Sequence, residues 1–229
     1  MENKWAIILG CSTGHGAATA KQLATEGYGI IGFHLDRGSI KKDALKLEQQ
    51  IASLNDNRVK FWNENAADKE IMSSKMDEIK SMLNNGTVKL LLHSIAFGST
   101  TNFFNPTPVR QRQMDMTQHV MAHCLIYWTQ ALLDNSLLTA GSRIIGLTSE
   151  GSYKAIDGYG PVGVAKASLE AVVRQIGWEL GSEGITANTI QAGITPTRAL
   201  TKISDDWEKW VEKTKERNPM KRVTTPEDV

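Results

Sequence analysis

The chain has 229 residues, of which 41% are hydrophobic and 22% are charged, a balance typical of a globular protein. Its 26 Lys and Arg residues nearly balance 25 Asp and Glu residues, and the formal net charge of +1 argues against a protein that binds nucleic acid through a broad basic surface. No apolar run reaches the roughly 18 residues of a membrane span, and the first residues lack a signal-peptide layout, so we expect a cytoplasmic protein without a membrane partner.

Short apolar runs alternate with longer amphipathic stretches along the chain. They predict strands at 5–9, 28–35, 58–63, 88–95, 143–148 and 185–191, and helices at 15–26, 39–54, 68–83, 110–133 and 161–180. Apolar strands separated by helix-length segments form a parallel sheet covered on both faces. We therefore expect an α/β fold with a doubly wound, Rossmann-type parallel sheet, in a single domain over residues 1–229.

The last residues carry a helix-start pattern. Thr225 is a capping residue, Pro226 suits the first helical position, and two acids follow in the first turn. The sequence stops one residue later, which suggests a chain truncated at its C-terminus, without a further helix and an edge strand.

A glycine-rich segment follows the first predicted strand and opens the first helix. Its glycines, Gly10, Gly14 and Gly16, are spaced Gly-x-x-x-Gly-x-Gly. Glycines at such a turn let the backbone approach a pyrophosphate, and free N–H groups at the helix start then face the anion. We expect a dinucleotide-binding loop; the alternative is a plain strand-to-helix turn.

The second predicted strand ends in an acid followed by a base, Asp36 and Arg37. An acid there accepts hydrogen bonds from the adenosine ribose, whereas an arginine pairs with the 2′-phosphate of NADPH. Because both are present, the sequence leaves the choice between NADH and NADPH open. A solvated turn is the alternative for both residues.

Six residues separate Tyr159 from Lys166, and Pro161 places a helix start just after Tyr159. Seven helical steps of ~100° make almost two turns, so Lys166 lies on roughly the same face as Tyr159. A lysine ammonium near a tyrosine hydroxyl lowers the tyrosine pKa and makes a poised proton donor. The alternative is that Tyr159 packs in a loop beside a solvated Lys166. Tyr153 is a rival tyrosine outside the helix.

Together these motifs resemble the short-chain dehydrogenase/reductase superfamily, and within it the enoyl-acyl-carrier-protein reductase branch. Ordinary members have three residues between the tyrosine and the lysine, whereas the six found here are typical of that branch. The segments 92–98, 165–171 and 188–194 are also similar to it. The resemblance covers essentially the whole chain, and the glycine loop combined with Ser149 looks most like the type III enoyl reductases.

Two positions bear on a ketoreductase alternative, in opposite directions. Ser149 stands where the most divergent enoyl reductases have a second tyrosine, and where ordinary ketoreductases have a catalytic serine. The asparagine of the ordinary catalytic tetrad falls near Met121, which cannot hold a polar relay. Ser149 therefore favours the ketoreductase alternative, and Met121 opposes it.

The resemblance implies a role for each motif. The implied catalytic residues are Tyr159, Lys166 and Ser149. The implied cofactor contacts are Gly10, Ser12, Thr13, Gly14, His15, Gly16, Asp36, Arg37, Asn65, Ala66, Ser94, Ile95, Ala96, Lys166, Ala192, Gly193, Ile194 and Thr197. Within this set, the Ile194 backbone would hold the nicotinamide carboxamide, and the Thr197 hydroxyl would bond the carboxamide or a phosphate. Asn65 would contact adenine, or its role would be only to stabilise a turn.

Residues 198–220 are expected to form a substrate lid. Ile203, Trp207, Trp210 and Val211 are spaced to make one apolar helical face. That face would line a channel for an acyl chain, or else pack in the core.

The function implied by the resemblance is NAD(P)H-dependent reduction of trans-2-enoyl thioesters carried by acyl-carrier protein or coenzyme A. A 3-oxoacyl or other carbonyl reductase and a non-enzymatic dinucleotide-binding sensor are the alternatives. Helices at 110–133 and 161–180 resemble the family's tetramer interface, which implies a homotetramer.

No metal site is expected. Cys11 and Cys124 match no metal-ligand spacing and fit free thiols in a reducing compartment. His119 and His123 share a helix face but have no acid at ligand spacing. His93 is interpreted as a structural residue at a strand end, with a proton relay as the alternative.

Overall fold

The computed structural model describes residues 3–203 and 206–229, and its centre is a six-stranded parallel sheet with strand order β3-β2-β1-β4-β5-β6. The strands are β1 (Lys4–Leu9), β2 (Gly29–His34), β3 (Val59–Asn63), β4 (Thr87–His93), β5 (Arg143–Thr148) and β6 (Thr186–Gln191). The chain winds outward from β1 to β3 and then returns to β4 beside β1. The predicted doubly wound fold is confirmed, and its order reverses between β1 and β4, where such sheets bind ligands.

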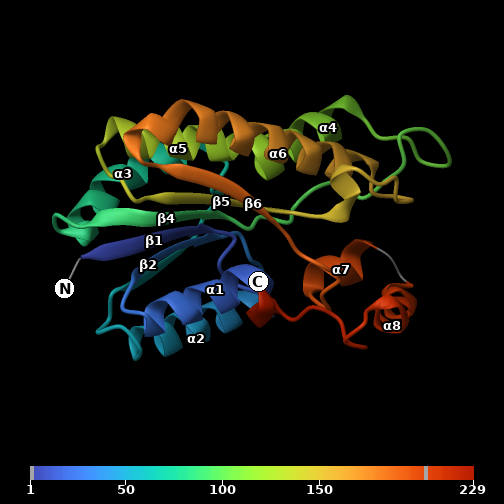
Figure 1. The fold of residues 1–229 in the computed structure, drawn as a ribbon, viewed down its shortest axis with the longest axis horizontal. Coiled ribbons are helices and arrows are strands. Elements are labelled where there is room, and N and C mark those ends of the chain that lie inside the picture. The colour runs from blue at the N-terminus through green and yellow to red at the C-terminus, as the bar shows by residue number, and fades with distance from the viewer. Residues whose placement is uncertain (1–2, 204–205) are drawn as a thin grey trace.

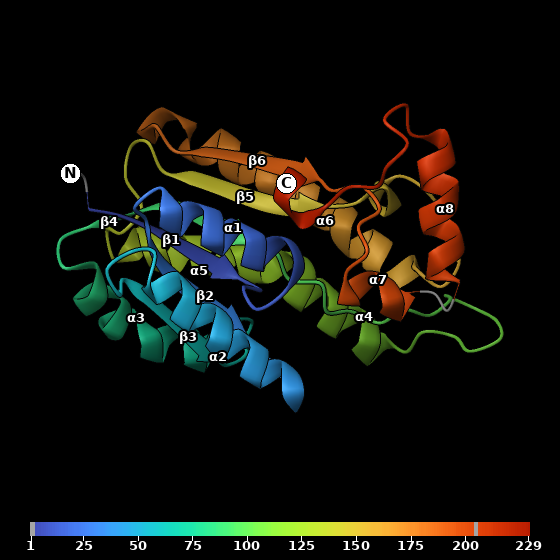
Figure 2. The same ribbon diagram turned by 90° about the horizontal axis from the view of Figure 1, so that it is seen from below.

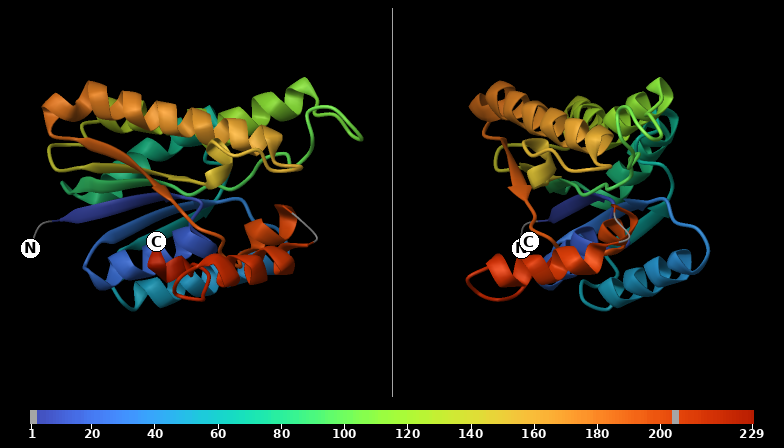
Figure 3. Two further views of the ribbon diagram at one scale, coloured as in Figure 1. Left: turned by 45° about the vertical axis from the view of Figure 1, so that its right-hand side comes forward. Right: turned by 90° about the vertical axis from the view of Figure 1, so that its right-hand side faces the viewer.

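Helices cover both faces of this sheet (Figures 1 and 3). They are α1 (Gly14–Thr25), α2 (Ser39–Ala52), α3 (Lys69–Leu83), α4 (Gln111–Gln118), α5 (Cys124–Asp134), α6 (Gly160–Leu180), α7 (Arg198–Ile203) and α8 (Trp207–Arg217). One face carries α1 and α2, and the other carries α3, α4, α5 and α6 (Figure 1). The last two helices, α7 and α8, lie beyond the carboxyl ends of the strands (Figure 2).

The alternation of side chains along β1 divides the interior into two cores. Ile7 and Leu9 belong to the core under α3, α5 and α6, whereas Ala6 and Ile8 belong to the core under α1 and α2. Successive side chains of a strand point to opposite faces, so a wholly apolar strand is buried on both. This is why the short apolar runs of the sequence become the interior strands.

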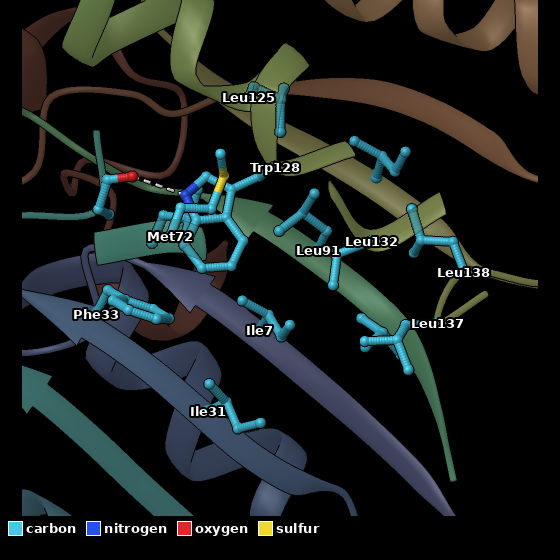
Figure 4. Packing of buried hydrophobic residues seen from close by; sticks show 14 of the residues in the cluster. Ile7, Ile31, Phe33, Met72, Leu91, Leu125, Trp128, Leu132, Leu137 and Leu138 are labelled. Atoms are coloured by element: carbon cyan, nitrogen blue, oxygen red, sulfur yellow. Dashed lines mark hydrogen bonds between the residues drawn. The ribbon is translucent and has the colours of Figure 1, made fainter. Parts of the chain in front are cut away.

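Trp128 of α5 is fully buried at the centre of the larger core (Figure 4). Its ring lies 4.8 Å from the ring of Phe33, between centroids, and its Nε1–H donates to the carbonyl of Ala66 at 2.7 Å. Ala66 follows β3, so this bond fixes the loop at the end of that strand. A buried indole needs such a partner, because an unpaired N–H in an apolar core is costly.

The predicted helix over 110–133 is wrong as a continuous α-helix. A π-helical turn, His119–His123, separates α4 from α5. In the same place the carbonyl of Val120 accepts from the Sγ of Cys124 at 3.2 Å and lies 3.1 Å from the Nε2 of His93. The extra residue of a π-turn leaves a carbonyl available to side chains, and such turns are frequent at functional sites.

The chain ends beside α1, as the views of Figures 1 and 2 agree. A 3₁₀ turn at Pro226–Asp228 has a capping box in which the Thr225 N–H donates to the Asp228 carboxylate at 2.8 Å. The predicted helix start is therefore present as one turn. Across residues 3–203 and 206–229, no helix is long and apolar enough to cross a membrane.

Candidate functional site

The glycine loop lies against the carboxyl ends of β2 and β4. The N–H groups of Gly10 and Cys11 donate to the carbonyl of Phe33 at 2.8 and 3.2 Å, and the Ser94 N–H donates to the carbonyl of Leu9 at 2.8 Å. A Cβ on Gly16 would lie 1.9 Å from the carbonyl oxygen of Gly10, so this helix start admits no side chain there. The loop is thereby held in a tight turn over the sheet.

The first turn of α1 is open to an anion. Thr13, its N-cap, makes no side-chain capping bond, and no acid stands in the first turn. The first N–H groups of a helix have no partner within it and carry the positive end of its dipole. Gly14, with a φ of 55°, keeps this approach free of a side chain.

His15 lies beside these amides. Burial lowers its pKa, while the neighbouring Pro226 carbonyl and Glu227 carboxylate oppose the shift. Its Nδ1 is buried without a hydrogen-bond partner among the described residues. An uncapped helix start next to an orphaned polar atom fits the pyrophosphate of a dinucleotide.

Asp36 is held beside the glycine loop. Its carboxylate Oδ2 lies 2.8 Å from the Nδ1 of His34, and it is one of the charges that raise the pKa of the buried Cys11 thiol, after burial itself. Arg37 is exposed and has no recorded hydrogen bond or ion pair in the described part of the chain. Sequence reasoning missed His34, although its i, i+2 spacing from Asp36 is the signal that would have found it.

The end of β3 supplies a structural turn. Asn65 is exposed, and its Oδ1 accepts from the Ala67 N–H at 3.1 Å, so the amide oxygen serves the local turn. Ala66 is buried, and its carbonyl is used by Trp128. The turn role weighed for Asn65 is present, and its adenine contact stays a prediction.

The loop after β4 brings Ser94, Ile95 and Ala96 next to the glycine loop. The Ser94 carbonyl lies so close to Gly10 that a Cβ there would be 2.7 Å away. Ile95 is partly buried against the core, and Ala96 is exposed. These three residues lie where the strand order reverses between β1 and β4, and their contacts with a cofactor stay a prediction.

Tyr159 is the N-cap residue of α6, two residues before Pro161 in its first turn. Its side chain is buried, and its hydroxyl lies 3.2 Å from the Oγ of Ser149, which follows β5. Burial raises the pKa of Tyr159, and the hydrogen bond with Ser149 opposes that shift. The sequence predicted a lowered pKa for Tyr159, and this is wrong for the structure, in which burial raises it.

Lys166 is buried two turns into α6, and its Nζ donates to the carbonyl of Leu147 at 2.6 Å. Burial lowers its pKa to about 8, while Cys124 and Glu170 oppose the shift. The solvated alternative for Lys166 is therefore wrong. A buried ammonium with one carbonyl acceptor keeps donors for a further partner.

Behind Lys166 lies a buried pair of neutral groups. The Sγ of Cys124 is 3.3 Å from the Nε2 of His93. Burial lowers the pKa of His93 to about 3 and raises that of Cys124 to about 12, with the nearby Lys166 charge acting on both. His93 is thus a buried strand-end residue, as interpreted from the sequence. Met121, at the tetrad position, is buried against Tyr159.

The loop after β6 reaches back to the glycine loop. A Cβ on Gly14 would lie 3.4 Å from the Cγ2 of Thr197, so these two predicted cofactor residues are neighbours. Thr195, which sequence reasoning missed, is buried and donates its hydroxyl to the Gly193 carbonyl at 3.0 Å. Ala192 and Ile194 are partly buried beside them.

Tyr153 lies apart from the Ser149–Tyr159 contact. It is 64% exposed, and its hydroxyl accepts from the Nε2 of Gln191 at 3.1 Å. Tyr153 therefore joins the loop after β5 to the end of β6. It does not replace Tyr159 as the buried tyrosine.

The predicted lid consists of two helices. Leu200 and Ile203 lie on α7, and Ile203 packs against the cluster that contains Tyr159. Residues 204–205 lie outside the described residues, and α8 carries Trp207, Trp210 and Val211, which are less exposed than their neighbours. The single helical face expected from Ile203 to Val211 is wrong, because Ile203 belongs to α7.

Among the described residues, no group of three His, Cys, Asp or Glu side chains could hold a metal ion. His119 instead places its Nε2 2.7 Å from the carbonyl of Ala67. Both Cys11 and Cys124 are buried free thiols.

Comparison with known proteins finds relatives along the whole chain. A protein-family model described as enoyl-(acyl carrier protein) reductase matches residues 10–229. The NADH enoyl-acyl-carrier-protein reductase FabI of Enterococcus faecalis is 30% identical over 232 residues, which cover 100% of this chain and 88% of that protein.

Two solved structures match this chain over its whole length. Their sequence identities to it are low, so they establish a shared fold and nothing more. An enoyl-acyl-carrier-protein reductase from Anaplasma phagocytophilum in complex with NAD has a TM-score of 0.80 at 22% identity, over 82% of that chain. L-sorbose reductase from Gluconobacter frateurii, complexed with NADPH and L-sorbose, has a TM-score of 0.84 at 19% identity, over 87% of that chain.

Proposed function

The chain belongs to the enoyl-(acyl carrier protein) reductase family of the short-chain dehydrogenase/reductase superfamily, and from that premise we propose that it reduces trans-2-enoyl thioesters. A bound NADH or NADPH supplies the hydride that adds to the β carbon of the enoyl thioester. The observation that carries the proposal is the buried Tyr159 hydroxyl, paired with Ser149 at the carboxyl end of β5.

In this proposal Tyr159 is the oxyanion donor. Hydride addition leaves negative charge on the thioester oxygen, and a fixed hydroxyl aimed at that oxygen stabilises the enolate. Burial raises the pKa of Tyr159, which keeps its proton in place as a hydrogen-bond donor at neutral pH. Ser149 orients the tyrosine hydroxyl and donates a second hydrogen bond near the substrate.

Lys166 has a binding role. Its Nζ is anchored on the Leu147 carbonyl and retains donors for the nicotinamide ribose. The glycine loop would hold the pyrophosphate, and the neighbouring Thr197 hydroxyl would bond a phosphate or the carboxamide. These residues converge because the loops after β1 and β6 and the first turns of α6 all lie at the carboxyl ends of the strands.

The acyl chain would leave the site under α7. Ile203 already packs with Tyr159, Met121 and Val162, which makes an apolar wall beside the tyrosine. An apolar wall next to a polar thioester end suits a fatty acyl substrate on acyl-carrier protein or coenzyme A.

A homotetramer is part of the proposal. The helices that resemble the family's interface carry exposed large side chains, among them Tyr127 on α5 and Trp178 on α6. Light scattering in solution tests this directly, since a tetramer has about four times the 25.2 kDa mass of the chain.

The experiment follows the loss of NADH and NADPH absorbance, separately, with a trans-2-enoyl thioester and with a 3-oxoacyl thioester. Faster oxidation with the enoyl substrate supports the proposal. Cofactor binding without turnover of either substrate contradicts it and favours a dinucleotide-binding sensor.

A carbonyl reductase is the second candidate. The observation that favours it is the 3.2 Å contact between Ser149 and Tyr159, which pairs two hydroxyls suited to a ketone oxygen. The buried Met121 opposes it, because a thioether replaces the polar relay of ordinary ketoreductases. Turnover of the 3-oxoacyl substrate alone would select this function.

A further inference from the structure

The end of β2 holds one carboxylate in a fixed place. His34 is the last residue of β2 and is buried, and its Nδ1 lies 2.8 Å from the Oδ2 of Asp36. Residues i and i+2 of an extended segment point to the same side, which is why these two side chains meet while Leu35 between them is exposed. Phe61 packs against the edge of the His34 ring, with 6.3 Å between the ring centroids.

The backbone of Asp36 is fixed independently of its side chain. Asn63 is the register partner of His34 across β2 and β3. Its Oδ1 accepts from the Asp36 N–H at 2.7 Å, and its Nδ2 donates to the Asp36 carbonyl at 3.1 Å. Asn63 thus positions the main chain of Asp36, and His34 positions the carboxylate.

This carboxylate lies near the glycine loop. The N–H groups of Gly10 and Cys11 bond the Phe33 carbonyl three residues before Asp36, and the Asp36 charge acts on the Cys11 thiol. With Oδ2 engaged by His34, the other oxygen of the carboxylate has no recorded partner in residues 3–203 and 206–229. A carboxylate oxygen accepts from hydroxyl groups and repels phosphate.

We propose that His34 and Asn63 are positioning residues that hold Asp36 as a preformed acceptor for the vicinal hydroxyls of the adenosine ribose, and that they make this chain selective for NADH over NADPH. The inference rests on the proposed function only in taking a nicotinamide dinucleotide as the ligand. A preformed acceptor binds without first being ordered, whereas the exposed Arg37 would have to be immobilised to pair with a 2′-phosphate.

The test measures binding without substrate, from the nicotinamide fluorescence of NADH and NADPH titrated into the full chain. We expect NADPH to bind about 100-fold more weakly than NADH, because the 2′-phosphate meets a fixed like charge. Equal or tighter binding of NADPH by the unchanged chain would overturn the inference, and this comparison requires no variant to fold.

Three variants distinguish a role of His34 in positioning Asp36 from a role only in supporting the fold. Asp36→Ala should weaken NADH roughly 10-fold or more and bring the two affinities close together. His34→Phe keeps a ring against Phe61 but removes the hydrogen bond, and should weaken NADH by about threefold to tenfold while leaving NADPH unchanged or tighter. His34→Gln, which retains a donor, should restore part of the NADH affinity.

The double variant His34→Phe/Asp36→Ala decides whether His34 acts through Asp36. If it does, the double variant binds NADH as Asp36→Ala does, because the two effects are coupled. Additive losses, or an equal loss for both cofactors, would mean that His34 is merely structural. His123→Phe is the matched control and should leave the affinity ratio unchanged.

The two proposals fail in different ways. An intact NADH preference without enoyl-thioester turnover overturns the proposed function and supports this inference. Enoyl turnover with equal use of NADH and NADPH supports the proposed function and overturns this inference.

Discussion

The Oγ of Ser149 lies 3.2 Å from the hydroxyl of Tyr159, although ten positions separate the two residues in the chain. Ser149 follows β5, and Tyr159 is the N-cap of α6, which packs back on β5 and β6. The return of the chain above the carboxyl end of β5 therefore places the two hydroxyls together. This contact is the centre of the proposed active site.

Removing the Tyr159 hydroxyl should abolish most of the activity. For Tyr159→Phe we expect turnover of an enoyl thioester to fall on the order of 10²- to 10³-fold, since it loses the oxyanion donor. NADH affinity should change little. Steady-state kinetics and cofactor fluorescence check the two parts, and near-normal turnover would reject the assigned role.

Ser149→Ala should have a smaller effect than Tyr159→Phe. Loss of a hydrogen bond that only orients the tyrosine is expected to cost about tenfold in turnover. A loss as large as that of Tyr159→Phe, measured with the same enoyl substrate, would instead make Ser149 a main oxyanion donor.

Lys166 should make stability depend on pH. Burial lowers its pKa to about 8 in the folded chain from an ordinary value of 10.5. Between these pH values the unfolded chain binds more protons, so the free energy of unfolding rises with pH through this range. Below pH 8 the buried charge carries its full penalty.

Lys166→Met should therefore raise the free energy of unfolding at pH 7 by on the order of 2 kcal/mol, after the lost bond to the Leu147 carbonyl is allowed for. This advantage should shrink between pH 8 and pH 10.5. Urea denaturation of both proteins at pH 7 and pH 10 measures the difference, and the same difference at both values would contradict the assignment.

Gly16 should tolerate no side chain. In Gly16→Ala the new Cβ would lie 1.9 Å from the Gly10 carbonyl, so the glycine loop must move. We expect loss of NADH binding in fluorescence titrations. Gly181→Ala is the matched control, because nothing lies within 4 Å of its Cβ and its φ is −60°; it should bind NADH normally.

Trp128 should stabilise the loop after β3 through one buried hydrogen bond. Trp128→Phe keeps an aromatic ring against Phe33 but leaves the Ala66 carbonyl without its donor. We expect the free energy of unfolding to fall by about 1–3 kcal/mol, as for other buried groups left unpaired. Chemical denaturation measures this loss, and an unchanged midpoint would show that water replaces the indole.

Hydrophobic periodicity predicted the six strands and the order of elements, because buried parallel strands are apolar on both faces. It could not predict the π-turn at 119–123, since one extra residue in a helix leaves the apolar pattern nearly unchanged. It also merged α7 with α8, because Ile203 and Trp207 keep helical spacing across the break. At the π-turn the backbone follows local hydrogen bonds that side-chain patterning does not record.

The sequence by itself determined the doubly wound sheet, the glycine loop and the place of Tyr159 just before the helix that carries Lys166, because each depends on local spacing and on the residue types at those positions. Only the tertiary structure decided how these groups are charged and held. Burial, rather than Lys166, sets the direction of the Tyr159 pKa shift, and Asp36 lies near the glycine loop because β2 and β1 are neighbours. Solvent exclusion and contacts between distant segments exist only after the chain has folded, and they account for both results.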